Sequence, residues 1–160
     1  MAYESDPIAQ KLNELVGSQE LYFGLLTFDG LPLAEQALIG TWELANEVYN
    51  GGFTQYFHNS SGRHAKPMVG ILRSINASRA ADILAKALAI AGSGTPWGDE
   101  PNFSKARSAM PEELKSHLRD LERDLYDELD NLHLQVFRYM SRNRSQFDVP
   151  EDFWKEPTAQ

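Results

Sequence analysis

Carboxylates, amides and aromatic rings gather on both sides of a glycine pair, Gly51-Gly52. The polar members are spaced three or four residues apart, as on one helix face before the pair and another after it: Glu43, Glu47 and Asn50, then Gln55 and Asn59. A carboxylate in such a place could act as a general base while the amides and His58 orient a ligand. The same groups could instead satisfy backbone groups at a helix junction. The sequence leaves both a small polar pocket and a structural junction open.

Other motifs for metal binding and catalysis are missing from the sequence. The four histidines include no pair at a spacing of three or four: His58, His64, His117 and His133. The chain has no H-E-x-x-H, P-loop or G-x-S-x-G motif, and it has no cysteine to supply a thiolate. We therefore predict no metal, no cofactor and no catalytic residue, and we favour a protein that is not an enzyme.

The chain is acidic, with a formal net charge of −8 over 160 residues. Its first fifty residues carry eight carboxylates and one lysine. This balance disfavours direct binding to nucleic acid or to an anionic membrane, and it favours a basic protein partner. The N-terminus is acidic and no apolar run is long enough to span a membrane, so we expect a cytoplasmic protein without a membrane segment.

A long helix, expected to have Pro111 and Glu112 in its first turn and Arg142 and Arg144 in its last, carries much of this acidity. Four of its carboxylates share a stripe away from the leucine face: Glu113, Asp120, Asp124 and Asp127. A basic stripe lies beside them and predicts the pairs Glu112–Lys115, Arg119–Glu122 and Arg123–Asp127. The acidic stripe is either a solvated face or an interface for a basic partner. Acids one turn apart give one charge per roughly 5.4 Å, against one per roughly 3.4 Å along a DNA strand, so one helix alone does not imitate DNA.

Apolar residues recur at helical spacing nearly throughout the chain. This pattern predicts one all-α domain over residues 1–160, with about six to eight helices and no β-sheet. The expected parts are N-terminal helices within 1–30, a core over 35–147, a loop at 92–101 and a C-terminal tail at 148–160. Asn50-Gly51-Gly52 is expected to end one helix, and Phe53, Tyr56 and Phe57 to form the aromatic face of a short helix after it.

The segment Asn50-Gly51-Gly52-Phe53-Thr54-Gln55-Tyr56-Phe57-His58-Asn59 resembles the hallmark of the helical domain in the DNA-mimic protein family. The resemblance extends over roughly residues 35–147. It implies an all-helical domain, in agreement with the periodicity. It also implies a protein that presents DNA-like negative charge to a DNA-binding partner.

Three other functions stay open at this point. The chain could inhibit a basic, toxin-like protein, or it could bind a small ligand at the glycine pair. It could also form a homodimer through aromatic side chains near its loop and C-terminus: Trp97, Phe103, Phe153 and Trp154.

Overall fold

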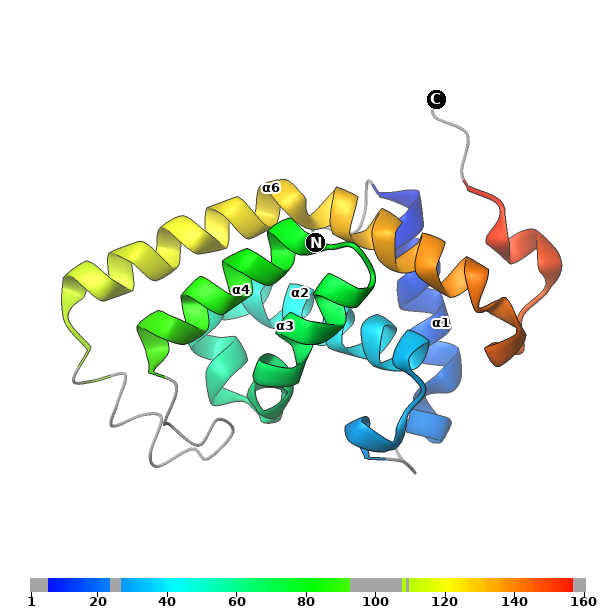
Figure 1. The fold of residues 1–160 in the computed structure, drawn as a ribbon, viewed down its shortest axis with the longest axis horizontal. Coiled ribbons are helices and arrows are strands. Elements are labelled where there is room, and N and C mark those ends of the chain that lie inside the picture. The colour runs from blue at the N-terminus through cyan, green and yellow to red at the C-terminus, as the bar shows by residue number, and fades with distance from the viewer. Residues whose placement is uncertain (1–5, 24–26, 93–107, 109, 157–160) are drawn as a thin grey trace.

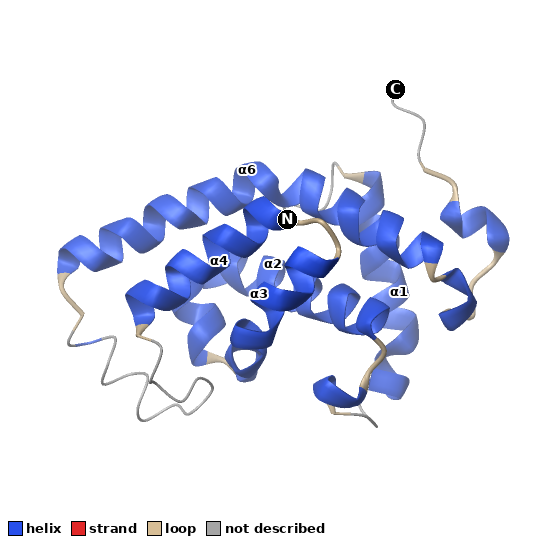
Figure 2. Ribbon diagram, viewed as in Figure 1, coloured by secondary structure: helices blue, strands red, loops and turns tan. Residues whose placement is uncertain are grey.

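A computed structural model describes residues 6–23, 27–92, 108 and 110–156 of the chain. This part contains five α-helices and four short 3₁₀ helices and has no strand (Figure 2). The α-helices are α1 (Pro7–Phe23), α2 (Leu33–His58), α3 (Ala65–Ser74), α4 (Ser78–Ala91) and α6 (Glu112–Arg142). The 3₁₀ helices are η1 (Phe28–Gly30), η2 (Ser60–His64), η3 (Arg144–Gln146) and η4 (Glu151–Trp154). The predicted all-α class is confirmed.

The long helix α6 extends across the molecule and packs against α1, α2 and α4 (Figure 1). Six residues of its predicted apolar stripe are buried: Leu118, Leu121, Leu125, Leu129, Leu132 and Val136. The two end residues of that stripe, Leu114 and Tyr139, are half-buried. These side chains meet the buried faces of the other helices in a single core, with α3 packed on α4 and on α2. The apolar spacing on α6 therefore explains why one long helix organises the fold.

Helix α1 begins as its sequence predicts. The Asp6 Oδ1 atom accepts a hydrogen bond from the backbone N–H of Ile8 at 2.9 Å, and Pro7 occupies the first helical position. Leu12 and Leu15 are buried in the core. Asp6 therefore caps the helix that lies against one end of α6.

The described residues contain five α-helices rather than the six to eight that we predicted. One reason is the glycine pair, which kinks a helix instead of ending it. Gly51 (φ −160°, ψ 20°) and Gly52 (φ 75°, ψ −177°) leave the helical conformation, yet α2 continues beyond them to His58. The two helices expected on either side of the pair are thus halves of α2. Most of the predicted loop at 92–101 lies outside the described residues.

The C-terminal segment folds back onto the helices. Trp154 is 8% exposed and packs on Phe137 of α6, with 6.0 Å between ring centroids. The Lys11 Nζ atom donates hydrogen bonds to the Phe153 and Lys155 carbonyls at 2.7 and 2.8 Å. Trp154 is therefore core within one chain rather than an exposed dimer contact. Two other residues expected to mediate dimerisation, Trp97 and Phe103, lie outside the described part.

None of the helices in the described ranges combines the length and the apolar character needed to cross a membrane.

Candidate functional site

The kink in α2 is held from outside by α6. The Glu122 Oε1 atom accepts a hydrogen bond from the backbone N–H of Phe53 at 2.9 Å. Gly52 permits this approach in two ways. Its φ of 75° lies in the region that favours glycine, and a Cβ atom at this position would collide with the Glu122 carboxylate. The glycine, the kink and the carboxylate therefore depend on one another.

A second side chain of α6 contacts the chain before the kink. The Tyr126 hydroxyl donates a hydrogen bond to the Val48 carbonyl at 2.8 Å, and its ring meets Tyr49 edge-on. In a regular helix, the Val48 carbonyl would accept from residue 52, and the Phe53 N–H would donate to residue 49. Glu122 and Tyr126 thus supply partners to backbone groups whose regular partners the kink displaces.

Glu47 joins the two halves of α2. Its Oε2 atom accepts hydrogen bonds from Gln55 Nε2 and from Asn59 Nδ2, both at 2.7 Å. These bonds are charge-assisted and short, which makes them stronger than bonds between neutral groups. Asn50 is exposed at the kink. Of the predicted amide and carboxylate residues, Glu47, Gln55 and Asn59 are therefore brought together, and they use much of their hydrogen-bonding capacity on one another.

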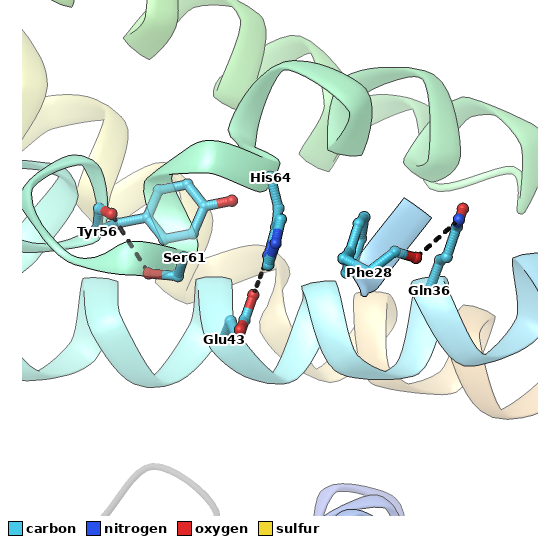
Figure 3. A network of polar contacts seen from close by, with 6 residues as sticks. All are labelled: Phe28, Gln36, Glu43, Tyr56, Ser61 and His64. Atoms are coloured by element: carbon cyan, nitrogen blue, oxygen red, sulfur yellow. Dashed lines mark hydrogen bonds and ion pairs between the residues drawn. The ribbon is translucent and has the colours of Figure 1, made fainter. Parts of the chain in front are cut away.

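Glu43 and His64 form a second polar link, shown in Figure 3. The His64 Nδ1 atom lies 2.7 Å from Glu43 Oε2, and the imidazole stacks on Phe28 with 4.0 Å between centroids. Gln36 Nε2 donates to the Phe28 carbonyl at 3.1 Å. These contacts connect η1, α2 and η2. They therefore hold in place the segment that follows the aromatic residues.

The three aromatic residues after the kink lie in the core rather than along an open pocket. Phe53, Tyr56 and Phe57 are fully buried. The Tyr56 hydroxyl has no hydrogen-bond partner among the described atoms. Burial, and then the charges of Glu43 and Glu47, raise the pKa of this phenol, so it stays protonated. The aromatic residues of the hallmark therefore anchor the second half of α2.

Two surface depressions border Glu122 on α6. One has a volume of about 320 Å³ and is lined by Gly51, Thr54, Lys115, Leu118, Arg119 and Glu122. The other, of about 360 Å³, is lined by Ser116, Arg119, Asp120, Glu122, Arg123 and Tyr126. Burial raises the pKa of Glu122 more than the Phe53 N–H and Arg119 lower it. Gln55 and Asn59 line neither depression.

The four acids of the predicted stripe on α6 are all exposed: Glu113, Asp120, Asp124 and Asp127. Among the described residues, Asp120 pairs with Arg123, and no ion pair involves the other three. Arg119 pairs with Glu112 at 2.9 Å rather than with Glu122. The residues of the basic stripe therefore pair largely with acids outside the acidic stripe. Most of the negative charge of the acidic stripe is left uncompensated among the described residues.

Further along α6, a group of titratable side chains joins this helix to the residue that precedes α1. The carboxylates of Asp6 and Asp130 and the imidazole of His133 approach one another within 4.8 Å. Asp6 precedes α1, so the group joins the start of that helix to α6. Sequence reasoning missed this contact because it joins residues more than a hundred positions apart.

The family described as DMP19-like protein has a sequence model that matches residues 29–143. This chain belongs to that family. The match spans α2, α3, α4 and α6, including the kink and the acidic stripe, and it leaves α1 outside. DMP19-like proteins are the DNA-mimic family that the hallmark segment suggested. No curated protein and no solved structure matches the chain.

Proposed function

We propose that this chain is a non-enzymatic interaction protein that presents DNA-like negative charge to a DNA-binding protein and so regulates it. The observation that carries the proposal is the exposed acidic stripe of α6 in a member of the DMP19-like family. A basic groove that binds phosphates also attracts a regular row of carboxylates.

The length of the acidic stripe follows from helical geometry. Glu113 and Asp127 are fourteen positions apart on α6, which corresponds to about 21 Å of helix. Four carboxylates over that length are more widely spaced than the phosphates of one DNA strand. Asp130 on α6 is also exposed, but Asp6 is largely buried and lies 3.1 Å from His133. A mimic therefore needs acids of other elements beside those of the stripe, because one helix alone is too sparse.

The test uses a tagged form of the chain to retain proteins from a lysate of the source cells at low and at high salt. The expected partner is a DNA-binding protein that this chain retains at low salt and releases at high salt. Added duplex DNA should also displace that protein from this chain. A triple variant, Asp120→Asn with Asp124→Asn and Asp127→Asn, should retain much less of it.

The matched control removes three exposed carboxylates elsewhere: Asp148→Asn, Glu151→Gln and Asp152→Asn. This control should retain the partner nearly as well as the unmodified chain. Equal loss in both variants would mean that only net charge matters and would contradict a specific acidic interface. A retained basic, toxin-like protein that DNA does not displace would favour the inhibitor function instead.

The alternative of a small-ligand or catalytic pocket rests on the depression beside Gly51 and Thr54. Its polar lining is Lys115, Arg119 and Glu122 rather than the amides that the sequence suggested. We rank this alternative second, because Glu47, Gln55 and Asn59 bind one another.

A further inference from the structure

Three side chains meet where the start of α1 lies against α6. Asp6 immediately precedes α1, while Asp130 and His133 are three residues apart on α6 and so share a face. One ligand atom of each residue lies within 4.8 Å of one atom of each of the others. Two carboxylates and one imidazole therefore converge on one small volume.

The three side chains differ in burial: His133 is buried, whereas Asp130 faces solvent, so the group is open on one side. His133 is only 5% exposed, and its Nδ1 atom lies 3.1 Å from Asp6 Oδ2. The other oxygen of Asp6 accepts the Ile8 N–H, which fixes the carboxylate. Asp130 is exposed and stands at the outer edge. A buried imidazole with an exposed carboxylate beside it leaves a route for an ion from solvent.

The charges at this position do not balance. No hydrogen bond or ion pair joins Asp130 to another described residue outside this group, and the only cationic group that Asp6 meets there is the imidazole. Within the described part of the chain, the two carboxylates thus face at most one positive charge. A divalent cation would compensate both carboxylates, and the acidic stripe nearby would raise its local concentration.

We propose that Asp6, Asp130 and His133 bind a divalent metal ion, with Zn²⁺ preferred. Imidazole nitrogen and carboxylate oxygen together suit Zn²⁺, whereas Mg²⁺ and Ca²⁺ prefer oxygen ligands alone. Three protein ligands leave a further coordination position for water. The coordinating nitrogen of His133 must be unprotonated, so binding releases any proton that this nitrogen carries.

Such an ion would link two parts of the chain that are far apart in sequence. Helix α1 precedes the residues that match the DMP19-like family, whereas α6 lies within them. The ion would fasten α1 to the family domain, and it would neutralise the carboxylates of Asp6 and Asp130. The site is thus structural, and it stands independently of the proposed function.

The test is a titration of the full chain, without a histidine tag and after treatment with a chelator, with Zn²⁺ alone. Calorimetry should show one saturable site per chain, and Tm should rise with the Zn²⁺ concentration because the ion binds only the folded form. Asp130→Asn removes an exposed ligand without disturbing the core. It should weaken binding by at least about tenfold.

Asp148→Asn is the matched control, since it removes another exposed carboxylate that is neither in the group nor in the acidic stripe. It should bind Zn²⁺ as the unmodified chain does. The proposal is overturned if no saturable site appears, or if the two variants bind equally. Tighter binding of Mg²⁺ than of Zn²⁺ would also overturn it, because it would exclude the imidazole as a ligand.

Discussion

The Glu122 carboxylate reaches from α6 to the backbone N–H of Phe53, 2.9 Å away, and caps the part of α2 that restarts after the kink. Gly52 provides both the backbone conformation and the space that this contact requires. The most recognisable sequence segment of the domain therefore has a physical reason: it is where α6 fastens the bend of α2.

Replacing Gly52 by alanine should destabilise the fold. A Cβ atom there meets the Glu122 carboxylate, and the φ of 75° is strained for alanine. We expect Gly52→Ala to lower the free energy of unfolding by about 1–3 kcal/mol. Gly70→Ala in α3 is the control, because a Cβ atom at Gly70 has open space and alanine favours a helix. Urea unfolding of both variants checks this, and equal stabilities would contradict the strain argument.

Glu122 should act through its hydrogen bond rather than through its charge. Glu122→Ala leaves the Phe53 N–H without this acceptor and should cost about 1–3 kcal/mol. Glu122→Gln keeps an oxygen at the same place and should cost much less. The comparison is a urea unfolding series, and a glutamine variant as unstable as the alanine variant would show that the charge is essential.

The raised pKa of Glu122 gives this comparison a pH dependence. Because burial raises the pKa above its ordinary value of 4.5, the folded state holds the proton more tightly than the unfolded chain does. Ionisation of Glu122 therefore costs stability as pH rises from that ordinary value through the folded pKa. Relative to unmodified protein, Glu122→Gln should gain stability as pH rises from about 4.5 through the folded pKa of Glu122. A difference that stays flat with pH would be inconsistent with the buried carboxyl.

The sequence indicated the helices but not the contacts between them. The apolar spacing on α6 predicted a buried leucine face, and the Asp6-Pro7 pair predicted the start of α1. Glu122 could not be singled out, since nothing local distinguishes it from the other acids of α6. Its role depends on packing against a kink 69 residues earlier in the chain.

The ion pairs show the same limit. Spacing along the helix predicted Arg119–Glu122 and Arg123–Asp127, but Arg119 pairs with Glu112 and Arg123 with Asp120. Glu122 turns inward to Phe53, so Arg119 pairs with an acid two turns back. The predicted Glu112–Lys115 pair is present at 3.9 Å. Periodicity identifies which partners are within reach, whereas tertiary contacts decide among them.

The bonds from Glu47 should stabilise the kink together. Gln55→Ala removes one of two amide donors to a charged acceptor and should cost about 1–3 kcal/mol. Glu47→Ala removes both bonds, so adding Gln55→Ala to it should cost little more. A double-mutant cycle in urea measures this coupling, with exposed Gln146→Ala as control. If Gln55→Ala leaves stability unchanged, the amide is available for a ligand. That result would favour the alternative of a small-ligand pocket at the glycine pair.

The Asp6 cap should make the stability of the fold depend on pH in the acidic range. Burial alone would raise the Asp6 pKa, but hydrogen bonds from His133, Ile8 and Ala9, with the charge of His133, outweigh it and hold the pKa below its ordinary value of 3.8. The stabilisation is therefore complete above that value and is lost as pH falls through the folded pKa.

With a chelator present, Asp6→Ala should cost about 0.5–2 kcal/mol at neutral pH and progressively less in acid. Asp148→Ala, at an exposed position, is the control. Thermal unfolding over a pH series measures both variants. A cost for Asp6→Ala that persists unchanged at the lowest pH would rule out the lowered pKa.

The most direct test of the proposed function is displacement of DNA from the DNA-binding protein that the chain retains. Labelled duplex DNA is bound to that protein, and the fluorescence anisotropy is followed as this chain is added. The proposal predicts that the unmodified chain and the C-terminal control variant release the DNA, while the Asp120, Asp124 and Asp127 triple variant does not. A stable complex containing DNA, partner and this chain together would contradict it, because a mimic and DNA cannot occupy the same surface at once.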